Sequence, residues 1–362
     1  MTLNYTAVQA LINKKYMPVL NDLIFKANHY LTRKMRDNAK TFNGRKIVVP
    51  LEYADSTSNV QFTSEYEVLD LKPVDPFTAA EYTPKMLTGH LTISKEDELI
   101  ANSDQAVKNL VQSKVKNLQK SIERVVSLRM FDRGTTSAKE WFSLNDLIGV
   151  ATIGGIPATG AVPDWWKSNV LDNTSYSDDC RVEGNVADPT KDCFILKILQ
   201  KNIAVCKYQT GEMPDTIICT QYIWDLLESV LEGTRKTGNK MDDKAGAMGF
   251  TALNYRGIAI VADEDLAEAQ SADNDGYMYF INMNYMYMYF NSKAKFTAGK
   301  FIEAINQNAM ASKVHAFGNS VISNRGVMSV QKDLYSPKTY SGAYYGADAT
   351  AVTPNAFDQA GI

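Results

Sequence analysis

Four cysteines are the first residues in this chain of 362 whose type and spacing could support chemistry. Cys180, Cys193, Cys206 and Cys219 follow one another at intervals of 13 residues, a regularity compatible with a metal site or with disulfides. If residues 191–207 form a helix, steps of about 100° place Cys193 and Cys206 about 140° apart around its axis, so the two thiols cannot bind one metal ion. The chain also lacks a CxxC pair. The pattern therefore favours buried, reduced thiols.

The histidines give no stronger indication of catalysis. His29, His90 and His315 lie in three different segments, and neither a GxSxG nor an HExxH motif accompanies them. Sequence distance alone does not exclude a catalytic triad, because the members of a triad assemble in space. In the absence of a supporting motif, we interpret the three histidines as structural.

Two loops resemble ligand-binding motifs but lack the groups that would bind. Gly233–Lys240 approaches a phosphate-binding loop, yet Asn239 stands where the lysine belongs, and the predicted helix precedes the loop instead of following it. Ser271–Gly276 approaches a calcium loop, yet Ser271 and Asn282 occupy the first and twelfth ligand positions, where carboxylates are required. We therefore predict a flexible loop and a tight turn at these two places.

The remaining acidic and aromatic groups also favour a structural interpretation. Asp178 with Asp179, and Asp242 with Asp243, are neighbours in polar loops, so their side chains diverge instead of converging on one pocket as acid–base catalysis requires. The aromatic run Tyr277–Phe290 lacks the interleaved Lys or Arg of a base-stacking surface and fits a β-sheet. We predict no catalytic residue, no metal site and no cofactor. The protein is then not an enzyme, and a metal-independent hydrolase is kept as a remote alternative.

Charge is distributed unevenly along the chain, whose net charge is −3. Residues 1–46 hold nine basic and two acidic side chains, whereas residues 47–102 hold three basic and ten acidic ones. Residues 103–134 return to a net charge of +4. Adjacent segments of opposite charge suggest complementary surfaces. The acidic balance of the whole chain argues against a protein that wraps nucleic acid over its entire surface.

No apolar run approaches the length of a membrane span. The longest, Tyr285–Phe290, has six residues, whereas about 20 are needed to cross a bilayer. The N-terminal residues lack the continuous apolar region and the small-residue cleavage site of a secretory signal. We predict a protein that contacts no membrane and stays in the compartment where it is made.

The first hundred residues divide into a basic helix and a β-rich segment. Residues 7–36 place apolar side chains at helical spacing, and Pro18 can start a second helical piece. We interpret the basic face of this helix either as a solvated surface or as a contact for an anionic partner. Three short β pieces follow between residues 46 and 94. Such a long hairpin is marginally stable alone, so we expect it to lie against another surface.

The longest periodic segment is Ser103–Arg133, with Ser103 as a plausible N-cap and Gly134 as a stop. At about 1.5 Å per residue it would form a rod of roughly 46 Å. A helix that is apolar on one stripe only is expected to lie across a surface and not inside a bundle. The stripe comprises Val107, Val111, Val115, Leu118, Ile122, Val125 and Val126.

Beyond Gly134 the pattern is typical of a compact α+β domain. Helices are predicted at 191–207 and at Gln221–Glu232, a buried strand at 215–220, and further strands at 256–263 and 275–290. These elements lack the regular alternation of a purely parallel βαβ sheet. The residues from Ser336 onward are rich in Gly, Ala, Thr and Tyr, and they predict an extended tail.

Taken in order, these features resemble the major capsid proteins of tailed bacteriophages, which have the Hong Kong-97 type coat fold. The most specific part is the stretch from Gly154-Gly155-Ile156 to Trp165-Trp166-Lys167, with its fixed downstream order. The segments that carry the resemblance cover most of the chain from 100 to 334. They are residues 144–173, 214–233, 249–266, 275–290 and 318–334.

The resemblance implies an α+β chain organised in six parts. They are an N-terminal helical arm at 1–46, an extended β-hairpin loop with adjoining strands at 47–102, a peripheral domain with a long spine helix at 103–142, a mixed axial domain at 143–267, return strands of the peripheral domain at 268–335, and an extended C-terminal tail at 336–362.

The same resemblance implies a structural function. Copies of the chain would assemble as hexamers and pentamers into the icosahedral or prolate head shell that encloses a double-stranded DNA genome. The protein would be part of the virion, assembled in the bacterial host cytoplasm, with a portal, a scaffolding or decoration protein and non-specifically contacted DNA as partners. An encapsulin-type nanocompartment shell, which binds cargo instead of confining DNA, is the alternative.

Two surfaces would serve this assembly. The acidic hairpin would lie on a basic surface of the adjacent copy, such as the spine helix. The contact residues predicted for it are Glu65, Glu67, Asp70, Arg124, Arg129, Trp165 and Trp166. The N-terminal helix would face the lumen and neutralise phosphates without reading bases. Its basic residues are Lys14, Lys15, Lys26, Arg33, Lys34 and Arg36.

Overall fold

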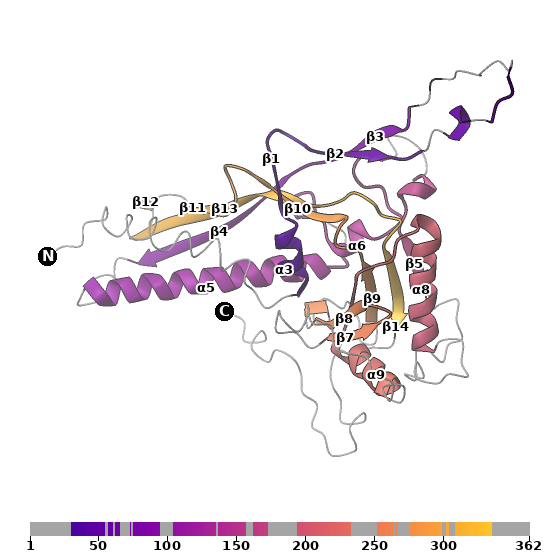
Figure 1. The fold of residues 1–362 in the computed structure, drawn as a ribbon. Coiled ribbons are helices and arrows are strands. Elements are labelled where there is room, and N and C mark those ends of the chain that lie inside the picture. The colour runs from indigo at the N-terminus through magenta and orange to yellow at the C-terminus, as the bar shows by residue number, and fades with distance from the viewer. Residues whose placement is uncertain are drawn as a thin grey trace.

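The computed structural model forms two six-stranded sheets and a separate two-stranded hairpin (Figure 1). Helices cover both sheets, and the hairpin projects away from the rest of the molecule. The residues that the structure describes are 30–54, 57–60, 62–65, 73, 75–94, 104–134, 137–156, 162–172, 194–232, 252–263, 265–266, 276–298, 302–303 and 308–334.

The first sheet is built on one long strand, β13 (Ala309–Ile322). Along one side β13 pairs antiparallel with β4 (Lys85–Ser94) over all ten residues of β4. On the other side it pairs antiparallel with β10 (Met286–Asn291), β11 (Thr297–Ala298) and β12 (Ile302–Glu303), and β1 (Lys40–Phe42) adds to β10 in parallel. Segments more than 200 residues apart thus share one sheet.

The predicted long helix is present as α5 (Asp104–Phe131), which lies along β4 (Figure 1). Gly89 of β4 lets the helix approach closely, since a Cβ at that position would lie 3.0 Å from the Ile122 Cδ1 atom. Ile122 and Val126 are buried, whereas Val125 is exposed. The prediction that Val125 belongs to the buried stripe is wrong, because each residue turns about 100° from the last and Val125 falls beyond the edge of the stripe.

The second sheet has the strand order β5-β14-β9-β6-β8-β7. β6 runs parallel to β8, and β14 runs parallel to β5, while the other neighbours are antiparallel. The expectation of a sheet that is not purely parallel is confirmed. The strands are β5 (Asn169–Asp172), β14 (Ser329–Leu334), β9 (Gly276–Ile281), β6 (Thr216–Cys219), β8 (Ile258–Ala262) and β7 (Ala252–Tyr255).

Two helices, α8 (Ile195–Thr210) and α9 (Gln221–Glu232), pack on the second sheet and share one hydrophobic cluster with it. α9 has the predicted bounds. α8 ends three residues later than predicted, because the chain first leaves the helix at Gly211, whose φ of +78° is the left-handed conformation that ends many helices. Of the predicted start of α8, residues 191–193 lie outside the described residues.

The separate hairpin consists of β2 (Ile47–Glu52) and β3 (Phe77–Tyr82), with the short helix η2 (Thr57–Asn59) nearer its far end. Two details differ from the prediction of three β pieces in one hairpin. The middle piece forms no strand at the described residues 57–60 and 62–65. The third piece is β4, which pairs with β13 and thereby places Leu91 and Ile93 in the main hydrophobic core, where an isolated two-stranded hairpin could not bury them.

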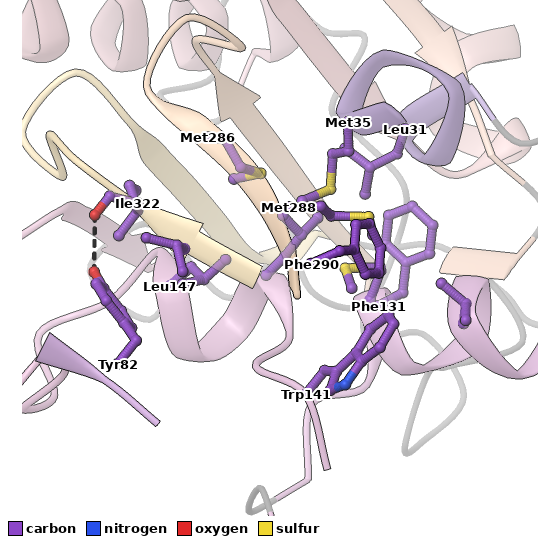
Figure 2. Close-up of a cluster of buried hydrophobic side chains, with 14 of the residues drawn as sticks. Leu31, Met35, Tyr82, Phe131, Trp141, Leu147, Met286, Met288, Phe290 and Ile322 are labelled. Carbon is purple, nitrogen blue, oxygen red and sulfur yellow. Dashed lines mark hydrogen bonds between the residues drawn. The ribbon is translucent and has the colours of Figure 1, made fainter. Parts of the chain in front are cut away.

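The main hydrophobic core joins the first sheet to α5, to α6 (Leu144–Leu147) and to α3 (Tyr30–Asp37). Figure 2 shows Leu31 and Met35 of α3 beside Met288 of β10. The predicted strands at 275–290 are β9 and β10, which are consecutive in sequence but belong to different sheets. This crossing couples the two halves of the molecule through one short turn.

Candidate assembly surfaces

The hairpin β2–β3, with the described residues 57–60 and 62–65 between its strands, is here called the arm. Its two strands bury one face and expose the other. Side chains alternate between the two faces of a strand. Ile47, Val49 and Leu51 point toward the body and are buried. On the opposite face Val48 is 54% exposed and Phe77 is 65% exposed. The outward face of the arm therefore carries large apolar side chains next to the exposed carboxylates of Glu52 and Glu81, where a solvent-facing strand ordinarily carries polar residues.

Apolar side chains continue toward the far end of the arm. Val60 is 77% exposed and Phe62 is fully exposed, at 106%. Glu65 is also exposed there. Glu67 and Asp70, which are predicted with Glu65 as acidic contacts, lie outside the described residues. Among the described residues, the far end of the arm thus exposes one predicted contact, Glu65. It also exposes Val60 and Phe62, which were not predicted as contacts.

The root of the arm rests on the segment 153–156 of the body. The Glu81 amide of β3 donates a hydrogen bond to the Gly154 carbonyl at 2.8 Å. Gly154 has a φ of +67°, and a Cβ on it would lie 2.9 Å from the Ala80 Cβ. Both the left-handed backbone and the close approach therefore require glycine at this position. This contact gives a physical reason for the Gly-Gly-Ile stretch that the sequence analysis singled out.

Tyr82 ties the same root to the first sheet. Its hydroxyl donates to the Ile322 carbonyl at 2.8 Å, as the dashed line in Figure 2 shows. Burial raises the pKa of the Tyr82 hydroxyl well above its ordinary value, although the bond to Ile322 and the charge of Arg325 oppose this change. The hydroxyl therefore stays protonated and keeps donating at neutral pH. The arm is thus fixed to the body at its root.

Trp165 and Trp166 of the short helix η3 (Asp164–Trp166) lie beside the arm root. The Trp165 ring stacks on Tyr53 with 5.3 Å between ring centroids. Trp166 is only 1% exposed, and its indole N–H donates to the Ile153 carbonyl at 3.0 Å. The predicted contact between Trp166 and another copy is wrong, because its side chain is enclosed within the subunit. For Trp165, which is partly exposed, the contact stays a prediction.

A cavity of about 440 Å³ lies next to this aromatic pair. Its walls come from the arm root at Tyr53, from Trp165, from the last turn of α8 and from Tyr285. Tyr285 is held there by a hydrogen bond from its hydroxyl to the Glu212 carboxylate at 2.8 Å. The subunit is therefore hollowed directly beside the point where the arm leaves the body.

The two arginines predicted as contacts on α5 differ in their surroundings. Arg129 Nε donates to the Trp141 carbonyl at 2.9 Å, and its guanidinium forms ion pairs with Asp132 and, at 3.6 Å, with Asp146. Arg129 thus holds the end of α5 to the following loop of the same subunit. Arg124 is exposed on α5, and its role as a contact stays a prediction.

Only the last part of the predicted N-terminal basic helix lies within the described residues, as α3. The Lys34 ammonium is 5.5 Å from the centroid of the Tyr30 ring, a cation–π contact within the helix. The lumen-facing role of this helix stays a prediction. The positions of Lys14, Lys15 and Lys26, and the side chains of Arg33 and Arg36, are outside the described structure.

The residues considered for chemistry are dispersed. Cys206 and Cys219 are free and buried, which confirms the expected burial of these two thiols. Burial raises the pKa of the Cys206 thiol to about 11 and that of Cys219 further still. His90 and His315 lie on β4 and β13, and they do not pair with each other in the register of these strands.

Two further findings concern only the part of the chain that the structure describes. No group of three or more His, Cys, Asp or Glu side chains in it could hold a metal ion. None of its helices is long and apolar enough to cross a membrane. The remaining candidates lie outside it: His29, Cys180, Cys193, the two aspartate pairs, the loop at 233–240 and residues 271–275 of the second loop.

Sequence reasoning missed two features, one on the arm and one near its root. Its apolar outer face could have been found, because Val48, Val60, Phe62 and Phe77 stand out in a segment that is otherwise acidic. Arg325, which is completely buried near the arm root, had no comparable signal. A single arginine between polar and glycine residues is typical of an exposed turn.

The arrangement of two sheets, a long helix and a projecting arm can be compared with known proteins. No protein-family model and no curated protein sequence matches the chain. Solved structures do match it. The capsid asymmetric unit of Cyanophage A-1(L) is 13% identical, with 86% of this chain and 94% of that chain covered and a TM-score of 0.58.

Two further structures are similar over most of the chain. The capsid of a native GTA particle is 10% identical, covering 83% of this chain and 89% of that chain with a TM-score of 0.51. The holo-SrpI encapsulin complex of Synechococcus elongatus PCC 7942 is 8% identical, covering 84% and 87% with a TM-score of 0.51. The fold is thus that of shell-forming proteins. More particularly, it is the α+β capsid fold of Hong Kong-97 type that the sequence resemblance predicts.

Proposed function

We propose that this protein is the repeating subunit of a closed protein shell, and specifically the major capsid protein of a tailed bacteriophage. The observation that carries the proposal is the arm, which projects from the body (Figure 1) and exposes the apolar side chains of Val48, Val60, Phe62 and Phe77. Large exposed apolar patches usually mark interaction sites. Identical copies are the partners that this fold favours, since its solved neighbours include a phage capsid and a GTA particle capsid.

The design of the arm supports contact with another copy. A two-stranded hairpin is marginal in water, and this one is held on its inner face by contacts at its root. The outer face, with Val48 and Phe77, gains burial only if a neighbouring molecule covers it. A contact between two different patches on each copy closes into rings when the rotation allows. Modest contacts repeated in this way stabilise a shell.

Charge supports the same contact. The acidic segment that contains the arm would meet a basic surface of the adjacent copy, where Arg124 on α5 is one exposed candidate. Because Val48, Phe62 and Phe77 are each more than half exposed in the single chain, we expect their burial to contribute more than the charges do. Assembly should then persist at salt concentrations that screen exposed ion pairs.

The remaining partners follow from the proposed role. The basic N-terminal residues, Lys14 to Arg36, would face the lumen and contact packaged double-stranded DNA without reading its sequence. A portal, and a scaffolding or decoration protein, would join the shell. The protein would then be a component of the virion, and assembly would take place in the bacterial host cytoplasm.

An encapsulin-type compartment is the second candidate, because the SrpI encapsulin shares the fold. Such a shell encloses protein cargo instead of a genome. Particles isolated from the natural producer distinguish the two: nuclease-protected double-stranded DNA and a single portal vertex support the phage capsid. A protein cargo without DNA supports the compartment.

The direct test is electron microscopy of the expressed full-length protein. We expect closed particles of uniform curvature, together with a particle-sized fraction in size-exclusion chromatography. A chain that stays a single compact subunit at every concentration, alone and with its neighbouring gene products, would contradict the proposed function.

A further inference from the structure

Arg325 is the most completely enclosed charge in the described structure. It lies in the turn between β13 and β14 and is 0% exposed. Its Nε donates to the Leu147 carbonyl at 2.9 Å, and one terminal nitrogen donates to Gly149 at 2.6 Å. The other terminal nitrogen donates to Ala151 at 2.8 Å and to Trp166 at 3.0 Å. One guanidinium therefore holds four backbone carbonyls of a single segment.

Within the described part of the chain, the charge of Arg325 is stabilised by backbone carbonyls and not by a carboxylate. Among the described residues no carboxylate pairs with it, and all four of its hydrogen bonds go to backbone oxygens. Burial lowers the pKa of Arg325 to about 10, so it is still charged at neutral pH. Burying a charge without a counter-ion is costly, and apolar packing would fill the same volume more cheaply. A residue kept under these conditions has a task beyond filling space.

The residues that Arg325 holds belong to two described stretches, 147–156 and 162–166, which together form the seat of the arm. Gly154 of this segment accepts the hydrogen bond from the Glu81 amide. Trp165 stacks on Tyr53, and Trp166 is bonded to Ile153. The inner face of the arm root therefore rests on backbone that is flanked on both sides by carbonyls bonded to the Arg325 guanidinium.

The second contact that holds the arm root lies close to Arg325 in the sequence. Tyr82 at the end of β3 donates to the carbonyl of Ile322, which is three residues before Arg325 in the same chain segment. The arm root is thus held both by residues 153–156 and by the end of β13. Arg325 follows the end of β13 in the chain and bonds to carbonyls on both sides of residues 153–156.

We propose that Arg325 is a positioning residue that fixes the direction in which the arm leaves the subunit. It acts through the backbone of residues 147–156 and 162–166 and not by touching another copy. The consequence for assembly rests on the proposed function, because an arm of variable direction cannot meet the same surface on every neighbour. The effect on the arm itself does not depend on assembly.

The test is hydrogen exchange of the unassembled full-length protein, measured by mass spectrometry, with the variant Arg325→Lys. Lysine keeps the positive charge but lacks the planar fork that reaches four separated carbonyls. We expect amides of β2 and β3 to exchange about tenfold faster, while β6 and β8 exchange as in the wild type. Under assembly conditions the variant should give irregular or fewer particles.

Asn202→Ala is the matched control for a loss of buried hydrogen bonds elsewhere. Asn202 on α8 is buried, donates to Ile198 and Gln331 and accepts from Ser329, and none of these bonds reaches the carbonyls that Arg325 holds. We expect this variant to loosen the second sheet and to leave the arm protected. Arg325→Lys would overturn the proposal if the arm exchanged at the wild-type rate, or if β6 and β8 loosened to the same degree as β2 and β3.

A second measurement applies if Arg325→Lys does not accumulate in soluble form. Native-state exchange of the wild type at low urea should then show one shared opening for the Glu81 amide and for Ser168, whose amide donates to Gly149. Separate openings for these two amides would overturn the proposal. The exchange result stands even if the wild type forms no shells, in which case the proposed function fails and the role of Arg325 is still decided.

Discussion

The arm and the second sheet use similar residues in opposite ways. In the second sheet, Ile217, Ile260 and Phe280 are enclosed between the strands and the helices α8 and α9. In the arm, Val48, Phe62 and Phe77 point outward on a two-stranded hairpin. One region therefore completes its own core, and the other leaves large apolar side chains exposed on the single chain. The proposed function accounts for this difference, because a neighbouring copy would cover those side chains in the shell.

The comparison also separates stability from assembly. Changes in the second sheet should lower the free energy of unfolding, because they remove burial that exists within one chain. Changes on the outer face of the arm should leave that free energy nearly unchanged, because the side chains are already exposed in the subunit. The arm root lies between these two cases, since its inner face is buried and its outer face is not.

The largest effect on stability that we predict concerns the arm root. Gly154→Ala places a Cβ 2.9 Å from the Ala80 Cβ and also strains a backbone with φ of +67°. We expect a loss of about 2–4 kcal/mol in the free energy of unfolding, from strain and overpacking together. Denaturant unfolding of the unassembled protein measures it.

Gly155→Ala is the matched control, because Gly155 has a nearly equal φ of +73° but no heavy atom within 4 Å of the added Cβ. We expect it to cost only about 1 kcal/mol, the price of the left-handed backbone alone. Equal losses for the two variants would show that the contact between Gly154 and Ala80 does not hold the arm root in place.

A smaller predicted effect is the difference in thiol alkylation between Cys206 in the core and a cysteine introduced at the far end of the arm. The pKa of Cys206 is raised from 9.0 to about 11 by burial, so its thiol stays protonated at pH 8 in the folded protein. Because alkylation requires the thiolate, iodoacetamide should leave Cys206 unmodified until the protein unfolds. A cysteine introduced by Phe62→Cys should react at once, roughly twentyfold faster at pH 9 than at pH 7. Site-resolved mass spectrometry measures both residues.

The same pKa sets the direction of one pH effect on stability. A raised pKa in the folded state means that the contribution of Cys206 is complete below pH 9.0 and is lost as the pH rises toward about 11. Replacement by alanine should therefore flatten the fall in stability over that interval. Rapid alkylation of Cys206 in the folded protein would contradict the closed core described for this half of the molecule.

How far the sequence could predict this molecule depends on the range of the interactions. The helices at 104–131 and 221–232 were predictable, because their apolar spacing and end signals are local. The pairing of β4 with β13 was not, because the partners are more than 200 residues apart and the strand pattern of β4 fits a hairpin equally well. Pattern fixes which face of a strand is apolar, but not which strand will cover it.

The location of the candidate surface was predictable from the sequence, but its exposed apolar side chains were not. Net charge located the arm, since residues 47–102 carry ten acidic side chains against three basic ones. It also directed attention to Glu65, Glu67 and Asp70, while the exposed Phe62 and Phe77 depend on which face is buried against the body. Arg325 could not be found at all, because its function rests on carbonyls at Leu147, Gly149, Ala151 and Trp166 that carry no signal in side-chain identity.

The central claim is that the outward apolar face of the arm joins identical copies. Its most direct test is the double variant Phe62→Ser with Phe77→Ser, compared with Phe62→Leu with Phe77→Leu, by analytical ultracentrifugation and electron microscopy under assembly conditions. We predict that the serine variant unfolds at the wild-type temperature yet stays unassembled, while the leucine variant forms shells. Normal shells from the serine variant would contradict the account.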